Sequence, residues 1–309
     1  MVLNQENINN FLNKYIDFVD KISDIYDYDS NIRHLLYLIV PAFVTKYDIS
    51  YEKVIIKCFE ETKIYVSGTE DDTVTATFNR ILKKKDSNYY TEKYIILNQY
   101  KNASFTNLID NIVHEFNHAI NSINNEITIE EKYIKLRTGL SYLIYDRETM
   151  NYICKSDAIF LEEVLNTKQS EEIINIIASF GNYNILNIEF SNLLYALKNE
   201  IGKNSYVSSA YLFQSLICDI LIKNKTFYPT ISNLRFKGYI EDIPVLFDNV
   251  IDKVGSYKYL NSLLKDIYNL QIKYIKTIFL KKRIANKIRN KAKDLCQLIQ
   301  EYDKKCIYK

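Results

Sequence analysis

The segment Asn111–Ile120 constrains this chain most, because it places two of only three histidines four residues apart. It reads N-I-V-H-E-F-N-H-A-I, so His114, Glu115 and His118 form the pattern H-E-x-x-H. Residues four apart on an α-helix point to the same side, and both imidazoles can then reach one metal ion. The pattern therefore predicts a helix with a pair of metal ligands and a neighbouring acid.

The surrounding residues favour that helix. Apolar side chains recur at intervals of three and four, and Ser104 and Thr106 are candidate N-caps. No glycine or proline interrupts before the polar run 121–125. The apolar positions are Phe105, Leu108, Ile109, Ile112, Val113, Phe116, Ala119 and Ile120.

Zinc is the metal that we expect at this helix. Neutral imidazole binds Zn²⁺ well, and a catalytic zinc keeps one coordination position for water, from which Glu115 would take a proton as general base. About 300 starting positions give roughly 0.002 chance occurrences of the pattern in so histidine-poor a chain. The alternative is a pair of hydrogen-bonded histidines, His114 and His118, on a buried helix.

A catalytic zinc needs a third protein ligand, and no histidine follows His118. We therefore expect a carboxylate from a later helix. The segment Phe160–Asn166 reads F-L-E-E-V-L-N and sets Glu162 and Glu163 among apolar residues, where an acid without a partner would be costly. Either acid is a candidate, and at least one of the two is expected to face solvent.

His114–His118 followed by Leu161–Thr167 resembles the zincin metallopeptidases, in particular the gluzincin branch, whose third zinc ligand is a glutamate on the next helix. The resemblance makes Glu163 the ligand. It departs from the family where Glu162 replaces an asparagine and Thr167 replaces an acid. The resemblance covers residues 93 to about 223.

The same resemblance assigns two further roles. Lys93–Asn98, the strand before the helix, would form the edge of a cleft, where a peptide substrate pairs as an added strand. A tyrosine on a helix after the glutamate motif would stabilise the oxyanion. Tyr206 is the candidate and Tyr211 the second choice, although either could be an ordinary packing residue in a chain with 27 tyrosines.

The expected fold is α+β and zincin-like, with a small antiparallel sheet before the H-E-x-x-H helix and a mainly helical C-terminal half. The sheet should contain strands at Val54–Phe59, Lys63–Val66, Val74–Phe78 and Lys93–Asn98. Arg80–Asp86 is expected to be a turn or a short helix. Further on, an extended stretch at Ile127–Arg137 and a hairpin of Leu140–Tyr145 with Met150–Cys154 should precede the helices.

Three parts are expected along the chain: an N-terminal helical segment at 1–50, a catalytic domain at 51–223 and a C-terminal helical region at 224–309. In the first part, Pro41 should kink or end a helix, and His34 is interpreted as structural. Helical segments are predicted at 157–166, 170–180, 185–199, 206–223 and from 240 onward. The stretch 224–238, with Pro229, is predicted to be a loop.

Composition narrows the class of protein. With 47% hydrophobic and 25% charged residues, the chain should fold into a globular core. Five cysteines without C-x-x-C spacing favour a reducing compartment, and neither a secretory leader nor a membrane-length apolar run is visible, so we expect a cytoplasmic protein with no membrane span.

Two stretches outside the motif invite a functional interpretation. Gly139 beside Arg137 suggests a bulge or a close backbone approach, and Arg137 would make a structural ion pair or bind a carboxylate. The basic segment 271–294 has apolar residues at helical spacing. Because the net charge is only +2, we interpret its lysines as a solvated helix face and expect no nucleic-acid partner.

The sequence thus predicts a hydrolase that uses Zn²⁺ to cleave a peptide or protein substrate, with Glu115 as general base and His114, His118 and Glu163 as ligands. The alternative is a zincin-like protein that binds a partner without turnover, which the imperfect glutamate motif suggests.

Overall fold

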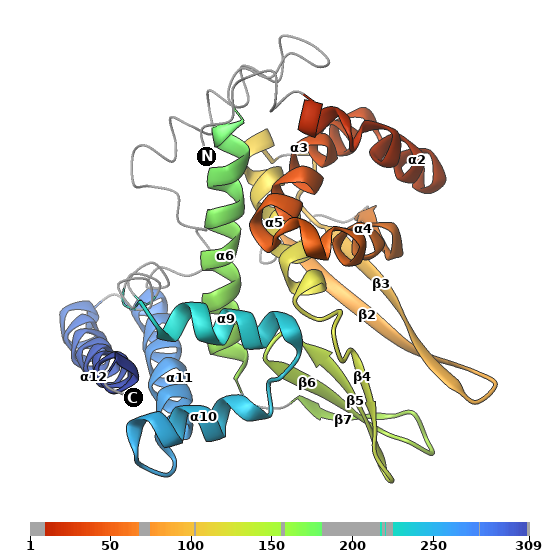
Figure 1. Ribbon diagram of the computed structural model, residues 1–309. Helices are drawn as coiled ribbons and strands as arrows, with labels where there is room; N and C mark the ends of the chain where they lie inside the picture. Colours follow the sequence, from red (N-terminus) through yellow and green to blue (C-terminus); the bar gives the residue numbers. More distant parts are fainter. Residues whose placement is uncertain are drawn as a thin grey trace. The chain divides into compact units, whose positions relative to one another are not determined.

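The computed structural model is an α+β protein with two small sheets among its helices (Figure 1). It describes residues 10–67, 75–101, 103–155, 158–180, 217, 220, 225–277 and 279–307. The α+β class expected from the sequence is confirmed.

Contacts divide the chain into two compact units. Unit 1 comprises residues 1–120 and 169–206, and unit 2 comprises residues 121–168 and 207–309. The division at 1–50, 51–223 and 224–309 stays a prediction, because it concerns which segments fold independently.

Unit 1 begins with helices that bury most of their apolar residues. Leu35–Val44, the most apolar run of the chain, lies fully inside α3 and is buried throughout. The ring of Phe59 contacts Phe43 and Phe116 at centroid distances of 5.5 and 4.2 Å, so three helices share one aromatic cluster. The elements are α2 (Ile16–Tyr26), α3 (Ser30–Tyr47), the 3₁₀ helix η1 (Ile49–Tyr51), α4 (Glu52–Glu61) and α5 (Phe105–Ile120).

One N-terminal prediction is wrong, and one alternative of another is excluded. Val54–Phe59 is not a strand but part of α4, because Ile55, Cys58 and Phe59 are the buried positions and their spacing is helical. Pro41 does not end its helix, since α3 continues to Tyr47.

The sheet of unit 1 has the strand order β1-β3-β2, with β1 (Thr62–Val66) parallel and β2 (Ala76–Lys85) antiparallel to β3 (Asn88–Leu97). The expected purely antiparallel sheet is therefore wrong. Lys93–Asn98 was expected at the edge, but β3 is paired on both sides, and β2 is an edge strand among the described residues.

Arg80–Asp86 also differs from expectation, because residues up to Lys85 extend β2 instead of forming a turn or helix. Residues 80–85 show no alternating apolar pattern in the sequence. They form a strand because they pair with β3, from Arg80 opposite Lys93 to Lys85 opposite Asn88.

Unit 2 contains an antiparallel sheet in the order β4-β5-β6-β7. Its strands are β4 (Ile127–Ile129), β5 (Tyr133–Thr138), β6 (Ser141–Asp146) and β7 (Tyr152–Lys155). The hairpin predicted here is confirmed. The stretch Ile127–Arg137 contains strands as expected, but it folds into two antiparallel strands, β4 and β5, instead of one extended segment. Asp146 accepts bonds from the backbone N–H of Glu148 and Thr149, which closes the hairpin turn.

The helices of unit 2 surround one apolar core, to which Leu165, Phe227, Phe247, Leu264 and Ile288 contribute. They are α9 (Phe227–Lys237), α10 (Asp242–Ile251), α11 (Ser256–Lys276) and α12 (Lys281–Ile307). The loop predicted at 224–238 is wrong, because α9 occupies most of it. Pro229 stands in the first turn of α9, where a missing N–H costs nothing.

Helix α6 (Ile159–Ser179) is a single helix where two segments were expected. Its residues up to Lys168 are assigned to unit 2 and those from Gln169 to unit 1. The segments predicted at 185–199 and 206–223 fall almost entirely outside the described residues.

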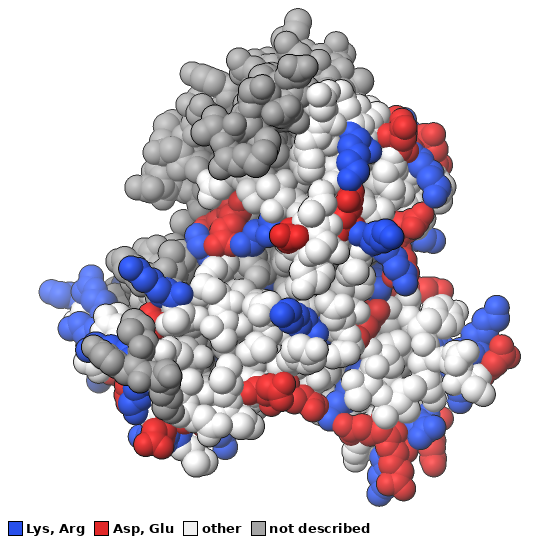
Figure 2. All heavy atoms as spheres, in the orientation of Figure 1, with Lys and Arg blue, Asp and Glu red and all other residues white. Residues whose placement is uncertain are grey.

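Within the described part of the chain, no helix has the length and apolarity to cross a membrane. Figure 2 shows acidic and basic side chains intermixed on the visible face. On α12 the apolar residues Ile284, Ile288 and Leu295 are buried in the unit 2 core, and Lys291 pairs with Asp266 at 2.8 Å. The basic segment 271–294 is thus divided between the end of α11 and the start of α12, and its part on α12 belongs to the outer face of an amphipathic helix.

Candidate metal centre

Helix α5 carries the H-E-x-x-H motif, and its start is fixed by a side-chain cap. The Ser104 hydroxyl accepts a hydrogen bond from the backbone N–H of Asn107 at 3.2 Å, as an N-cap does. Ile109, Ile112, Val113 and Phe116 are buried, so the apolar stripe fixes the rotation of the helix. The predicted helix is confirmed.

The two histidines of the motif lie beside that stripe. Their ring centroids are 5.0 Å apart in an edge-to-face arrangement. His118 is buried and His114 is half-buried, as expected where a helix borders a polar site.

Glu163 completes a group that could hold a metal ion. One ligand atom from each of His114, His118 and Glu163 lies within 4.8 Å of the others. Imidazole nitrogens and carboxylate oxygens bind a zinc ion at about 2.0–2.2 Å. Two imidazoles and a carboxylate also form a ligand set that zinc accepts.

Glu115 is nearly buried and is oriented by the sheet of unit 1. Its Oε2 accepts a hydrogen bond of 2.6 Å from the backbone N–H of Phe78 on β2. Peptide groups alternate in direction along an antiparallel strand, so this N–H points away from β3. Among the described strands, β2 is at the edge of the sheet, and Glu115 is thus held at that edge.

Tyr47 links the motif helix to the C-terminal part of α6 within unit 1. Its hydroxyl lies 2.8 Å from Asn117 Oδ1 and 3.3 Å from Gln169 Oε1. Both acceptor side chains are buried. Tyr47 therefore ties α5 to the helix that carries Glu163.

Glu162 is engaged by other groups. Its carboxylate accepts hydrogen bonds from Nε and Nη2 of Arg235, the former at 2.7 Å, and from the backbone N–H of Leu140 at 2.8 Å. Glu162 and Arg235 are both buried, and Arg235 also donates to Asn166 Oδ1 at 2.9 Å. Glu162 is thus part of a buried ionic network and does not face solvent.

Gly139 makes room for this carboxylate. It has φ +54°, and a Cβ at this position would lie 2.0 Å from Glu162 Oε2. The predicted close backbone approach is confirmed. Arg137 is also buried and donates to the backbone carbonyls of Asn124, Gly139 and Arg235, so its role is structural.

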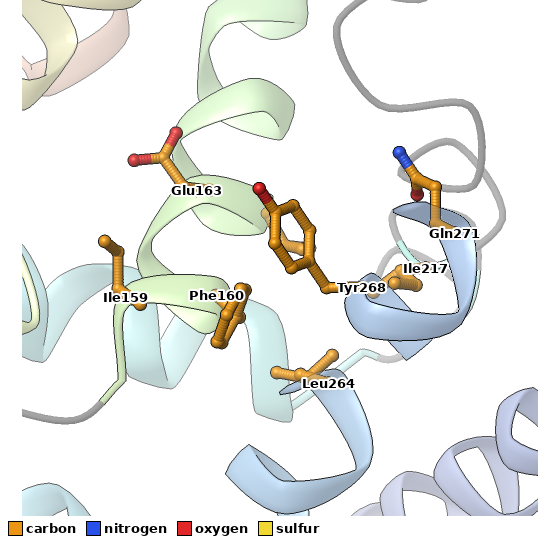
Figure 3. Close-up of a pocket in the computed structure, with 8 residues that line it drawn as sticks. Ile159, Phe160, Glu163, Ile217, Leu264, Tyr268 and Gln271 are labelled. Atoms are coloured by element: carbon orange, nitrogen blue, oxygen red, sulfur yellow. The ribbon is translucent and has the colours of Figure 1, made fainter. Parts of the chain in front are cut away.

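An apolar pocket of about 110 Å³ adjoins Glu163 (Figure 3). Its walls come from α6, α11 and Ile217. The rings of Phe160 and Tyr268 contact each other at 4.7 Å between centroids, and the Tyr268 hydroxyl points toward the side of the pocket where Glu163 lies.

Tyr206 and Tyr211 fall outside the described residues, so the oxyanion role stays a prediction. His34 lies on α3 near Tyr37, with ring centroids 6.3 Å apart, and is not in the metal-ligand group.

Sequence reasoning missed Phe78, Tyr47 and Arg235. The first acts through its backbone and the second is one tyrosine among many, so neither has a recognisable local signal. Arg235 lies 73 residues from Glu162, and only its complete burial reveals its role.

Comparisons with protein-family models, with curated proteins and with solved structures found no match to this chain.

Proposed function

We propose that this chain is a zinc-dependent hydrolase that cleaves peptide bonds. The observation that carries the proposal is the grouping of His114, His118 and Glu163 within 4.8 Å, with Glu115 on the same helix as the histidines. This arrangement has three donors for the metal and a separate carboxylate for proton transfer, as a hydrolytic zinc site requires.

Zinc in such a site supplies a Lewis acid for the scissile carbonyl and lowers the pKa of water. Glu115 takes a proton from the attacking water and delivers it to the leaving amine. The Phe78 N–H keeps the carboxylate oriented for both transfers.

The edge strand β2 is the place where a peptide substrate would pair. Its outward-facing peptide groups lie on either side of Phe78, whose own N–H donates to Glu115. An extended peptide added to this edge would present its backbone next to the general base. Lys93–Asn98 lies mostly on β3, which pairs with β1 and β2 and so offers no free edge to a peptide.

The decisive experiment is Glu115→Gln. The amide oxygen of glutamine can still accept from Phe78 but cannot take a proton, so cleavage of a peptide library should fall at least 100-fold while stoichiometric zinc stays bound. Metal analysis and mass spectrometry of the digests measure the two quantities. Glu131→Gln, a change of the same kind at an exposed acid, serves as control and should leave both unchanged.

Full cleavage by the Glu115→Gln protein, or zinc lost with activity intact, would refute the assignment. Stoichiometric zinc in the parent chain without cleavage of any peptide would instead favour the alternative, a metal-containing binding protein. The replacement of the family's asparagine by Glu162 motivates that alternative.

A further inference from the structure

The connection between α11 and α12 in unit 2 exposes three large apolar side chains, which we call the apolar tip. Phe279 is 93% exposed, Ile275 is 60% exposed and Leu280 is 53% exposed. Ile284 and Ile288, further along α12, are instead buried in the core of unit 2. Single exposed apolar residues are ordinary, but a group of them in one short stretch marks a surface that contacts a partner or a membrane.

Exposed basic residues flank the apolar tip on both sides, and we call them the basic collar. They are Lys273 and Lys276 in the last turn of α11 and Lys281, Lys282 and Arg283 in the first turn of α12. Because α11 and α12 pack against each other, their joined ends bring the two groups together (Figure 1). No acidic residue occurs between Asp266 and Asp294, so this stretch of the chain carries only positive charge.

Neither helix stability nor ion pairing accounts for the basic collar. The helix dipole favours acids in the first turn of a helix, yet α12 begins with three cations. Within the part of the chain that the structure describes, no carboxylate pairs with the basic collar, and the nearest ion pair along the chain joins Lys291 to Asp266. The charge of the basic collar is therefore available to a negatively charged partner.

The partner that fits both features is apolar inside and negatively charged at its surface. A membrane with acidic headgroups has this structure, because apolar side chains enter its interface while lysines and arginines bind the headgroups. Nucleic acid would use the cations, and a base could stack on Phe279, but the aliphatic Ile275 and Leu280 would stay in water. A second copy of this chain would bring two basic collars together, and their like charges would oppose the contact.

We infer that the apolar tip and the basic collar form a site that attaches this protein to the surface of an acidic membrane. The attachment is peripheral, since no helix among the described residues could span a bilayer. The site lies wholly within unit 2 and uses none of the residues of the candidate metal centre, so the inference does not depend on the proposed function.

The chain contains no tryptophan, so one introduced at the apolar tip reports on its surroundings. With vesicles of phosphatidylcholine and phosphatidylserine, the fluorescence of full-length Phe279→Trp should shift to shorter wavelength, and lipids brominated on their acyl chains should quench it. Val254→Trp is the matched control, because Val254 is 95% exposed at the opposite end of α11. Its fluorescence should stay the same when vesicles are added.

Cosedimentation with the same vesicles measures how much each feature contributes. A basic residue near an anionic surface contributes about fivefold in affinity, so Lys282→Gln with Arg283→Gln should weaken binding about 10- to 30-fold. Phe279→Ser should weaken it about 10-fold or more, because the variant leaves no ring to enter the interface. Val254→Ser should bind like the parent chain.

Absence of parent-chain binding to the anionic vesicles would overturn the inference, as would equal binding to vesicles of phosphatidylcholine alone. Unchanged binding by Phe279→Ser would also overturn it, because the protein would then adsorb through charge without inserting the apolar tip. Salt-sensitive binding to single-stranded DNA without binding to vesicles would overturn it in favour of a nucleic-acid surface.

Discussion

At the scale of single residues, local spacing predicts some of the candidate site and long-range packing determines the rest. His114 and His118 share one side of α5 because a helix imposes it, whatever the fold around them. The choice between Glu162 and Glu163 could not be made from spacing, since adjacent helical residues point about 100° apart. Arg235 distinguishes them in the structure, because its guanidinium engages Glu162.

The buried pair Glu162–Arg235 leads to a prediction about stability. Arg235→Met should lower the free energy of unfolding by about 3–5 kcal/mol, because it leaves the Glu162 charge buried without its partner. Zinc affinity should also fall about 10-fold or more, since Glu162 anchors the turn of α6 that carries Glu163. Urea unfolding and metal competition measure the two effects.

The double variant Glu162→Gln with Arg235→Met is the control for that prediction. It removes both charges and should recover much of the lost stability, giving a large coupling energy in a double-mutant cycle. Additive losses would show that the two side chains do not depend on each other. Unchanged zinc affinity in Arg235→Met would show that the pair does not position Glu163.

At the scale of secondary-structure elements, prediction succeeded where the pattern was long and periodic. The H-E-x-x-H helix and the β6–β7 hairpin carried such patterns. It failed at Val54–Phe59, where β-branched residues suggested a strand, because packing of Phe59 against other helices outweighs intrinsic preference. The strand order was also predicted wrongly. The residues of Lys93–Asn98 do not indicate whether this strand pairs with one neighbouring strand or with two.

The edge position of β2 leads to a second prediction. Phe78→Pro removes the N–H that donates to Glu115, but it removes no hydrogen bond between β2 and β3. Edge strands also tolerate proline. The variant should fold, and kcat/KM for a cleaved peptide should fall about 10-fold or more, because a hydrogen bond to a charged group is lost.

Thr77→Pro is the comparison for this variant. Its N–H points toward β3, so the substitution should weaken the sheet itself, which circular dichroism and thermal unfolding would detect. Equal damage to folding by both substitutions would contradict the assignment of β2 as a free edge beside Glu115.

At the scale of the whole molecule, the 27 tyrosines make alkaline pH a general stress. Burial raises the pKa of Tyr28 and Tyr37 in unit 1 and of Tyr302 in unit 2. Burial likewise raises the pKa of Tyr257 to about 12. Both units therefore contain phenols that resist ionisation while the chain is folded.

The sign of the pH effect follows from these raised values. Tyrosines of the unfolded chain lose their protons near pH 10, whereas the buried tyrosines of the folded chain keep theirs to higher pH. Their contribution to the free energy of unfolding is therefore fully present below about pH 10, and it is lost as the pH rises through the folded pKa. For Tyr257 this window runs from about 10 to about 12. The free energy of unfolding should thus fall between pH 9 and pH 11.

Between pH 9 and pH 11, the free energy of unfolding of Tyr257→Phe should decrease by about 1 kcal/mol less than that of the parent chain, because the variant has one ionisable phenol fewer. Urea unfolding at the two pH values measures it. Tyr239→Phe, at an exposed position, is the control and should behave like the parent chain. An identical fall in the parent and in Tyr257→Phe would contradict the prediction.

The contact between Gly139 and Glu162 also makes three positions of unit 2 depend on one another. Any side chain at position 139 would occupy the space of the Glu162 carboxylate, which Arg235 and the Leu140 N–H hold in place. A glutamate at position 162 in this arrangement therefore requires glycine at position 139. Replacement of Glu162 or Arg235 alone would leave a buried charge without its partner, so only coordinated changes at these positions preserve the packing.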